Sequence, residues 1–401
     1  MHGKQTVTVF LALVLSFFLS CLTGCQKSVG NTTKIGVITS LTGSQAAFGE
    51  AHKNGYAIAL DDINARGGIL GKKAELDIYD DQSKTDQAVQ GVSKLIDQDH
   101  VPILLGAYSS ENTKAIIPAV TQRQIPLIIP TATADNVMDS RSPWVFRICA
   151  GAADYANATL DFLKANGNPR KIAIVYENTN FGQANRKAME AAAKADGMEI
   201  VDIESYEAKS PDYKSVLQRV KQANPDVIYF CSYLLDAGTL MRQTQEVDLN
   251  PAYYTSAGTG FAAAEFPTAK GAGKNAEYTF STSQWLPEAQ WPGSKEFDAE
   301  YFKRFHSHPA YHAIQAYAAL QAAAKAMNDA GSLDAAKIRD AIKALQEPST
   351  PFGPVHFDAN GQNQHPVLIT QVQGGQYKVV FPAGAADSKP IIPAPKWSER
   401  K

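Results

Sequence analysis

The chain has 401 residues, enough for two domains of ordinary size, and 44% of them are hydrophobic, as in a typical globular protein. Its 38 basic and 40 acidic residues give a formal net charge of -2. This balance excludes a general polyanion binder, so we expect no nucleic-acid partner.

The N-terminal segment has the pattern of a secretory signal. Lys4 precedes an apolar run from Val7 to Leu19, which is too short to span a bilayer but suits a signal peptide. The run ends in Leu22-Thr23-Gly24-Cys25, which resembles the bacterial lipobox, so we predict that Cys25 is lipidated; an ordinary signal peptide followed by a chance cysteine is the alternative. The diacylglyceryl group and an N-acyl chain would anchor the exported protein to the bacterial membrane, facing the periplasm or the cell exterior. No later apolar segment is long enough for a membrane helix, so the body of the chain is expected to be soluble.

Two further cysteines, Cys149 and Cys231, each stand at the end of an apolar run. Their simplest interpretation is as small buried hydrophobic residues. A disulfide between them is the alternative, because an exported protein folds in an oxidising compartment.

Strand-like and helix-like segments alternate along most of the chain. In the first part we expect strands at 35–39, 74–79, 101–105, 125–129 and 144–148, and helices at 50–65, 85–97 and 111–123. In the second part we expect strands at 171–176, 199–203, 227–230 and 252–255, and helices at 155–165, 183–196, 213–223 and 237–246. The last part adds a strand at 277–283, helices at 294–305, 313–328 and 334–345, and strands at 367–372 and 377–381. This alternation predicts an α/β protein with two doubly wound, Rossmann-like lobes and a ligand cleft between them.

Hydroxyl side chains follow two neighbouring strands of the first predicted sheet. Ser110 comes after the strand at 101–105, and Thr131-Ala132-Thr133 comes after the strand at 125–129. In an open parallel sheet, ligands bind outside the carboxyl ends of the strands, where helix N–H groups favour negative charge. The two segments together therefore predict an anion-binding cradle. Taken singly, Ser110 has a simpler interpretation as a helix N-cap, and the threonines as turn residues.

Several motifs are similar to those of the leucine/isoleucine/valine-type periplasmic binding proteins, the ligand receptors of ABC importers. The resemblance covers nearly the whole mature chain. It is carried by Gly49-Glu50-Ala51-His52-Lys53-Asn54-Gly55, Ile63 to Gly71, Tyr79-Asp80-Asp81, Tyr176 to Gly182, Asp212-Tyr213, Asn224-Pro225-Asp226 and Phe357 to Gly361. It implies a type I periplasmic-binding-protein fold, in which two lobes joined by three hinge crossings close on a ligand.

The resemblance also implies how this chain is divided. The crossings would fall near residues 148–151, 280–283 and 360–365. Lobe 1 would comprise residues 34–149 plus 283–362, and lobe 2 residues 150–282 plus 363–382. A signal peptide at 1–24 and a tether at 25–33 precede them, and Pro390, Pro393 and Pro395 indicate a flexible tail at 383–401. We expect a monomer that delivers its ligand to an ABC permease in the membrane.

The resemblance assigns roles to particular residues. Ser110 and Thr131-Ala132-Thr133 match the family's carboxylate cradle, the same residues that the strand ends indicate. Phe48 stands where an aromatic residue lines the ligand side-chain pocket. The second lobe would contribute Phe181 and Tyr233.

One position departs from the family pattern. Amino acid receptors of this family usually have an acidic residue after the strand near Thr255, where it pairs with the ligand ammonium, but this chain has Ala257 in a segment without a carboxylate. A buried ammonium without a partner costs several kcal/mol. Either another acid such as Asp236 serves, or the ligand has no amine. A branched-chain amino acid is therefore the first expected ligand, and amine-free organic or aromatic acids are the alternative.

The sequence contains no motif that predicts catalysis. Gly-x-Ser-x-Gly and Cys-x-x-Cys motifs are absent, and Gly271 to Asn275 lacks the spacing of a phosphate-binding loop. The one histidine cluster, His306, His308 and His312, surrounds Pro309 and is interpreted as a solvated loop rather than a metal site. We expect no enzyme activity, no cofactor and no metal. A ligand-sensing module for a membrane signalling partner is the alternative to a transport function.

Overall fold

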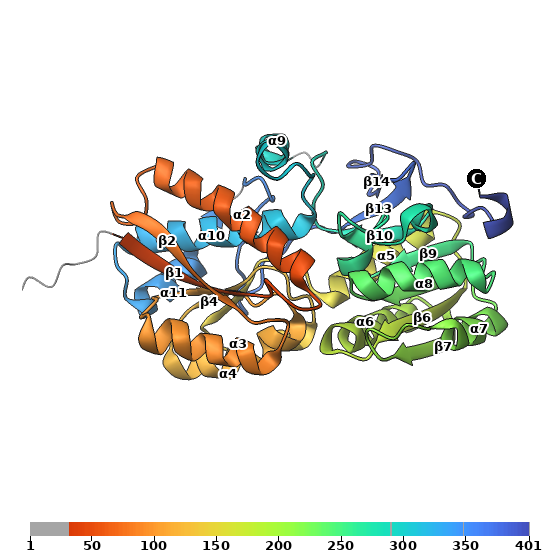
Figure 1. Cartoon of the computed structure of the whole chain (residues 1–401), viewed down its shortest axis with the longest axis horizontal. Coiled ribbons are helices and arrows are strands. Elements are labelled where there is room, and N and C mark those ends of the chain that lie inside the picture. The colour runs from red at the N-terminus through yellow and green to blue at the C-terminus, as the bar shows by residue number, and fades with distance from the viewer. Residues whose placement is uncertain (1–31, 289–290, 348, 401) are drawn as a thin grey trace, which may run out of the picture.

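The computed structural model describes residues 32–288, 291–347 and 349–400. The signal segment and the predicted lipidation site Cys25 lie outside these residues. Figure 1 shows two lobes side by side along the long axis, with β1 in one lobe and the C-terminus at the far end of the other.

Lobe 1 is built on a five-stranded parallel sheet of order β2-β1-β3-β4-β5. Its strands are β1 (Thr32–Thr39), β2 (Lys73–Asp80), β3 (Leu104–Leu105), β4 (Leu127–Ile129) and β5 (Val145–Arg147). The helices between them are α2 (Ala46–Ala65), α3 (Thr85–Ser93), the π-helical turn η1 (Lys94–Gln98), α4 (Ser110–Arg123) and the short η2 (Asp135–Val137). The central strands read as nearly continuous apolar runs because helices cover both faces of a parallel sheet.

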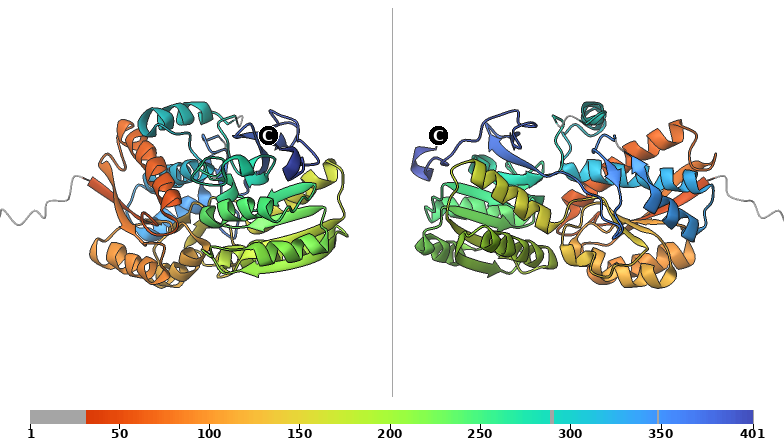
Figure 2. Two further views of the ribbon diagram at one scale, coloured as in Figure 1. Left: turned by 45° about the vertical axis from the view of Figure 1, so that its right-hand side comes forward. Right: turned by 180° about the vertical axis from the view of Figure 1, so that it is seen from behind.

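Three helices from the C-terminal part of the chain return to lobe 1. They are α9 (Ser294–Phe305), α10 (Tyr311–Ala330) and α11 (Ala335–Ala344), followed by the small hairpin of β11 (Gln346–Glu347) and β12 (Val355–His356). The view from behind in Figure 2 shows α10 and α11 among the N-terminal elements. Helices α2 and α10 pack so closely that a Cβ at Gly55 would lie 1.9 Å from the Ala313 carbonyl oxygen, so only glycine fits there.

Lobe 2 has a four-stranded parallel sheet of order β7-β6-β8-β9. Its elements are β6 (Lys171–Glu177), β7 (Glu199–Tyr206), β8 (Val227–Cys231) and β9 (Tyr253–Ser256), with α5 (Ala152–Ala165), α6 (Asn180–Ala195), α7 (Lys214–Ala223), α8 (Leu234–Glu246), η3 (Thr259–Ala262) and η4 (Gly273–Ala276). An antiparallel sheet of β10 (Phe280–Ser283), β13 (Leu368–Gln373) and β14 (Gln376–Phe381) adjoins β9 through a bridge between Tyr254 and Thr279. The predicted α/β class with two doubly wound lobes is confirmed.

Three chain segments connect the lobes and are hydrogen-bonded to one another. The backbone N–H of Ala150 in the first donates to Gln284 Oε1 in the second at 2.8 Å, and Gln362 Nε2 in the third donates to the Cys149 carbonyl at 2.8 Å. The hinge positions and lobe boundaries implied by the family resemblance remain predictions. Residues 280–283, near which the second crossing was expected, form β10 and pair with β13.

Cys149 and Cys231 are both buried, and both are free thiols. The Cys149 thiol lies 3.4 Å from the Ala132 carbonyl. The interpretation as small buried residues is therefore confirmed, and the alternative of a disulfide between them is wrong.

The C-terminal residues pack on lobe 2, in contrast to the loose tail expected from their prolines. Trp397, in η5 (Trp397–Glu399), is only 7% exposed, and its ring N–H donates to the Leu249 carbonyl at 2.8 Å. The Ala394 N–H donates to the Ala252 carbonyl, and the Arg400 guanidinium lies 3.5 Å from the centre of the Trp397 ring. Long-range contacts of this kind leave no local pattern in the sequence.

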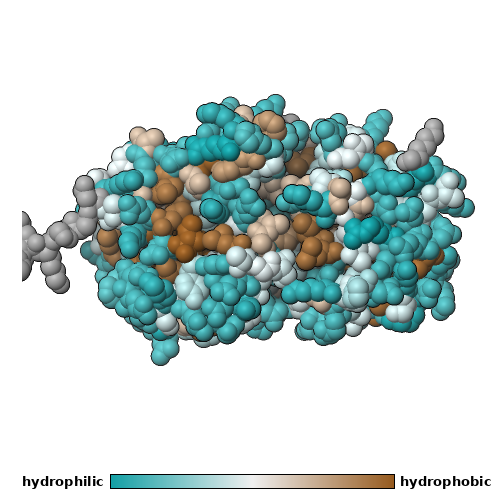
Figure 3. All heavy atoms as spheres, viewed as in Figure 1, coloured by the Kyte–Doolittle hydropathy of each residue, from teal (hydrophilic) through white to brown (hydrophobic). Residues whose placement is uncertain are grey.

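Figure 3 shows mainly hydrophilic residues on one face of the molecule, around a band of hydrophobic residues that runs over lobe 1 toward the junction. Within the part of the chain that the structure describes, no helix combines the length and apolar character needed to cross a bilayer. Among the same residues, no three His, Cys, Asp or Glu side chains gather as metal ligands would.

Candidate functional site

The loops after β3 and β4 meet at the N-terminus of α4. Ser109 is the N-cap, because its Oγ accepts a hydrogen bond from the Asn112 N–H at 3.1 Å. Ser110 is the first helical residue, and its Oγ accepts from the Ala134 N–H at 3.2 Å. The N-cap is thus Ser109, and the alternative interpretation of Ser110 as the N-cap is wrong. The Ser110 hydroxyl instead links the loop after β3 to the loop after β4 by a hydrogen bond.

The two predicted threonines of the second loop have different environments. The Thr131 hydroxyl donates to the Tyr108 carbonyl at 3.1 Å, so it holds the loops in place. Thr133 is 3% exposed, and its Oγ1 has no hydrogen-bond partner among the described residues. Leaving a buried hydroxyl unpaired costs about 1–3 kcal/mol, which a hydrogen-bonding ligand would recover. The intervening Ala132 is buried and contributes its backbone.

Aromatic rings from both lobes meet in front of this cradle. Phe48, in the first turn of α2, stacks on Tyr108 with ring centres 4.7 Å apart and 9° between the planes. Tyr233, the N-cap residue of α8 in lobe 2, lies 6.1 Å from both rings, and Phe181 of α6 lies 5.1 Å from Tyr233. The three predicted aromatic residues are thus brought together. Tyr108 was missed, although an aromatic residue beside two serines at a strand end was a usable signal.

His312 also belongs to this cluster. It lies in the first turn of α10, is 2% exposed, and its ring centre is 4.9 Å from that of Phe48. Burial holds its pKa well below the usual value, so the ring is neutral. The prediction of one solvated histidine loop is therefore wrong for His312. His306 and His308 are exposed, and His308 pairs with Asp298.

The segment that replaces the family's acidic residue offers backbone groups and hydroxyls. Ala257 is buried and donates its N–H to the Phe230 carbonyl at 2.9 Å. Two residues later, the Thr259 N–H donates to the Tyr311 hydroxyl at 3.0 Å. Asp236, the other acid considered, accepts the Lys209 N–H at both carboxylate oxygens, at 3.0 and 3.1 Å.

Glu177, which sequence reasoning missed, is a buried acid on the lobe 2 side of the cleft. It ends β6, and its carboxyl accepts the Tyr233 N–H at 2.9 Å and the Thr179 hydroxyl at 2.8 Å. Burial raises its pKa to about 8, against these two hydrogen bonds. A charged residue that ends an apolar strand was the available signal.

Lobe 2 also contacts the cradle directly through Asn180, the first residue of α6. Its side chain exchanges two hydrogen bonds with the amide of Asn136, at 2.7 and 3.0 Å. Its backbone N–H donates to Glu111 Oε2 at 3.2 Å, and its Nδ2 lies 3.4 Å from the Ser110 carbonyl. The structure is therefore a closed arrangement of the lobes.

A cavity of about 240 Å³ lies between the lobes beside the aromatic cluster. Lobe 1 lines it with Ser109, Glu111 and Asn112, and lobe 2 with residues that include Glu177, Tyr233 and Asp236. Polar groups from both lobes therefore border this space. Of the predicted ligand-binding residues, Tyr233 lines it, whereas Ser110 and Thr133 do not.

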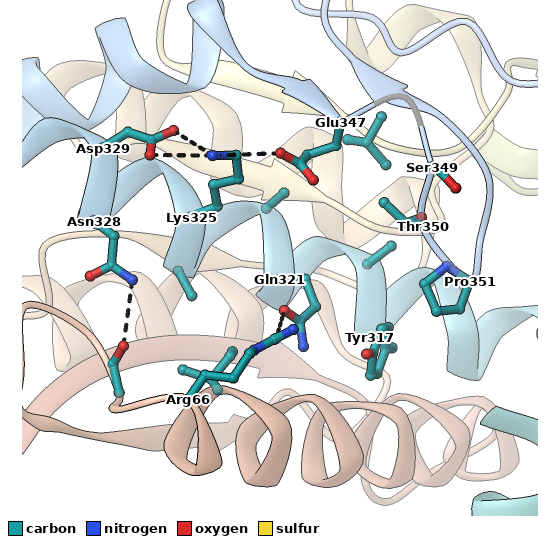
Figure 4. A pocket seen from close by; sticks show the side chains of 16 residues that line it. Arg66, Tyr317, Gln321, Lys325, Asn328, Asp329, Glu347, Ser349, Thr350 and Pro351 are labelled. Carbon is teal, nitrogen blue, oxygen red and sulfur yellow. Dashed lines mark hydrogen bonds and ion pairs between the residues drawn. The ribbon is translucent and has the colours of Figure 1, made fainter. Parts of the chain in front are cut away.

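A second hollow, of about 410 Å³, lies elsewhere on lobe 1 and is drawn in Figure 4. It is at the C-terminal ends of α2 and α10, whereas Phe48 and His312 are at their N-terminal ends. Its charged side chains are paired with neighbours, since Lys325 reaches both Asp329 and Glu347, at 3.1 and 3.5 Å. We therefore place the candidate site in the cleft.

Known proteins of similar sequence and fold are solute-binding proteins. The Leu/Ile/Val-binding protein homolog 7 of Brucella abortus (strain 2308) is 28% identical over 377 residues, which cover 90% of this chain and 94% of that protein. The branched-chain amino acid transporter substrate binding protein LivJ of Streptococcus pneumoniae, solved in complex with isoleucine, is 25% identical with a TM-score of 0.80, covering 88% of this chain and 100% of that chain. A solute binding protein of an ABC transporter from Rhodopseudomonas palustris, solved with 3,4-dihydroxy benzoic acid, is 24% identical with a TM-score of 0.78. The match covers 87% of this chain and 95% of that chain.

A family model described as periplasmic binding protein matches residues 32–376, which include both lobes and the three crossings. Membership of this family implies a function outside the cytoplasm. The fold, the cleft and the sequence match agree, and the chain belongs to the periplasmic binding protein family.

Proposed function

We propose that this protein is the solute-binding lipoprotein of an ABC importer, and that it binds a small carboxylate-bearing ligand between its lobes. The observation that carries the proposal is the buried, unpartnered hydroxyl of Thr133 next to Ser110 at the N-terminus of α4. A helix N-terminus and a free hydroxyl together suit a carboxylate, because both offer hydrogen-bond donors to negative charge.

The rest of the ligand would contact aromatic rings from both lobes. Phe48 and Tyr108 belong to lobe 1, whereas Phe181 and Tyr233 belong to lobe 2. A ligand that touches both sets favours the closed arrangement over any open one, because it binds the closed form more tightly. The rings are suited to an apolar or flat ligand body.

The first ligand we propose is a branched-chain amino acid. The Brucella relative is named a Leu/Ile/Val-binding protein homolog, and the Streptococcus structure holds isoleucine. The absence of an acid after β9 favours a second candidate, an amine-free organic or aromatic acid, whereas Glu177 and Asp236, which line the cavity, favour an amino acid. The Rhodopseudomonas structure with 3,4-dihydroxy benzoic acid has the same fold.

Calorimetry with matched ligands separates the two candidates. L-leucine is compared with 4-methyl-2-oxopentanoate, and phenylalanine with 3-phenylpropanoate. A site that pairs the ammonium with a charged group should reject the amine-free member by several kcal/mol, since that group would be left unpaired. Equal or tighter binding of the amine-free member would exclude the amino acid and support an organic-acid receptor.

Substitutions in the cradle test the binding site itself. Thr133→Val keeps the shape of the side chain and removes the hydroxyl, so it should weaken binding of the preferred ligand by roughly 10- to 150-fold. Thr244→Val is the matched control, because it also removes a buried hydroxyl, one that donates to the Leu240 carbonyl within α8 of lobe 2, so it should lower the melting temperature and leave affinity nearly unchanged. Unchanged affinity in Thr133→Val would contradict the proposed site.

We propose a monomer that docks on an ABC permease and is anchored through lipid on Cys25. The family match and the lipobox resemblance support this role. A ligand-sensing module for a membrane signalling partner uses the same cleft. Loss of uptake of the bound solute in a deletion strain, restored by the intact gene, distinguishes transport from sensing.

A further inference from the structure

Arg147 is a buried arginine directly behind the cradle. It ends β5 and is 4% exposed. Its Nη1 donates to three successive backbone carbonyls, those of Ala132 at 3.4 Å, Thr133 at 3.1 Å and Ala134 at 3.1 Å. These residues lie outside any helix or strand, so the guanidinium supplies part of the order that a strand ladder would otherwise give.

The three hydrogen bonds fix which way the loop faces. In a trans peptide the N–H points away from the C=O, so carbonyls drawn toward Arg147 turn the partner N–H groups to the opposite side. The Ala134 N–H shares a peptide with the Thr133 carbonyl, and it donates to Ser110 Oγ on the cradle side. The Thr133 carbonyl also accepts the Ala152 N–H at 2.8 Å, so Arg147 and the start of α5 together set the orientation of the Thr133 backbone, from which its unpartnered hydroxyl projects.

The rest of the guanidinium reaches the connections between the lobes. Nε donates to Gln362 Oε1 at 2.5 Å, and Gln362 Nε2 donates in turn to the Cys149 carbonyl at 2.8 Å. Nη2 lies 3.6 Å from Asp135 Oδ1. Arg147 thus contacts the third crossing directly and, through Gln362, the first.

Asp135 extends this chain of contacts into lobe 2. Its carboxylate accepts the N–H groups of Ala152 and Ala153, the first residues of α5, at 3.1 and 3.0 Å. A Cβ at Gly151 would lie 2.3 Å from Asp135 Oδ1 and 2.7 Å from Arg147 Nη2, so the first crossing passes closely over this ion pair. The position of α5 is therefore linked to the shape of the cradle loop.

We propose that Arg147 is a positioning residue for ligand binding, which shapes the 131–134 loop and couples that shape to the position of lobe 2 through Asp135 and Gln362. The arginine fork suits this role because its five donors are held in one plane and serve several acceptors at once. The effect on affinity rests on the proposed function, since it requires that Thr133 bind the ligand. The effect on the conformation of the 131–134 loop does not depend on the proposed function.

The test compares Arg147→Met, which removes every hydrogen-bond donor of the side chain, with Arg147→Lys, which retains the positive charge but has fewer hydrogen-bond donors. Arg219→Met is the matched control, because Arg219 pairs with Glu204 on the surface of lobe 2. In the ligand-free protein, amide hydrogen exchange of residues 132–135 should be about 10-fold faster or more in Arg147→Met and intermediate in Arg147→Lys. It should be unchanged in the control. Unchanged exchange in both Arg147 variants would overturn the inference.

Binding provides the second measurement, with L-leucine and 3,4-dihydroxy benzoic acid as probes. Arg147→Met should weaken binding of the probe that the native protein prefers by roughly 10- to 100-fold, and Arg147→Lys by less. Adding Thr133→Val to Arg147→Met should then reduce affinity much less than Thr133→Val does in the native background. The reason is that a hydroxyl already displaced from the ligand contributes little to binding. Fully additive losses, or a lower melting temperature with unchanged affinity, would show a merely structural role. If Thr133→Val alone has no effect, the proposed site fails, while hydrogen exchange still decides the role of Arg147.

Discussion

The buried carboxyl group of Glu177 should make the stability of this protein fall as the pH rises. Its pKa is raised from 4.5 to about 8, first by burial and then by the nearby acids Asp236 and Glu111, against hydrogen bonds from Tyr233 and Thr179. Between these two pH values the folded protein keeps a proton that the unfolded chain has released. The stabilisation is therefore complete below about pH 4.5 and is lost as the pH rises through about 8.

The size of the effect follows from the two pKa values. The interval between 4.5 and about 8 corresponds to an upper limit of roughly 5 kcal/mol, at about 1.4 kcal/mol for each pKa unit. Replacement by glutamine should remove this dependence, because an amide does not titrate. The amide can also keep both contacts, since its oxygen can accept the Tyr233 N–H and its nitrogen can donate to the Thr179 hydroxyl.

Urea unfolding of the native protein and of Glu177→Gln at pH 5.5, 7 and 8.5 measures the difference directly. The free energy of unfolding of the native protein should fall relative to that of the variant by several kcal/mol between the first and last pH. Glu199→Gln, at the exposed start of β7, controls for the loss of an acid. If the free energy of unfolding changes with pH equally in the native protein and in Glu177→Gln, the reasoning is refuted.

Three further outcomes are expected. Asn180→Ala removes the amide contact between the lobes and should speed ligand release by roughly 5- to 10-fold in stopped-flow measurements, with little change in melting temperature. Trp397→Ala should cost about 3–5 kcal/mol of lobe 2 stability, measured by urea unfolding, and leave ligand affinity unchanged well below the transition. Cys25→Ser should move the exported protein from the membrane to the soluble fraction and abolish palmitate labelling; continued membrane association would exclude the lipid anchor.

The architecture was predictable from sequence because apolar runs and amphipathic helices alternate in chain order, which permits few topologies. The antiparallel sheet of β10, β13 and β14 was not predictable from sequence, because about a fifth of the chain separates its first strand from the other two. Residues 383–401 were predicted to form a loose tail because of their prolines, yet the burial of Trp397 holds the end of this segment on lobe 2. Such contacts depend on tertiary packing and leave no periodic signal.

Part of the candidate site could also be predicted. Ser110 and Thr133 follow neighbouring parallel strands, and strand ends meet at one edge of a sheet whatever the loops do. The contribution of His312 was missed because Pro309 indicated a loop, whereas α10 begins two residues after the proline. Tyr108 was missed because its stacking partner Phe48 lies in a different sequence segment, and only the folded chain brings the rings together.

Two missed residues share a pattern that the sequence does contain. Arg147 follows the apolar pair Val145-Phe146, and Glu177 follows the run Ile172 to Tyr176, so each places a charged group at the carboxyl end of a buried strand. Burying an unpaired charge costs several kcal/mol, so such a residue must find partners or lose its charge. Arg147 finds backbone carbonyls of the cradle loop, and the carboxyl of Glu177 retains its proton. Arg147 lies on the lobe 1 side of the cleft and Glu177 on the lobe 2 side. A charged residue at the end of an apolar strand therefore indicates the edge of the sheet at which the candidate site lies, even where no motif does.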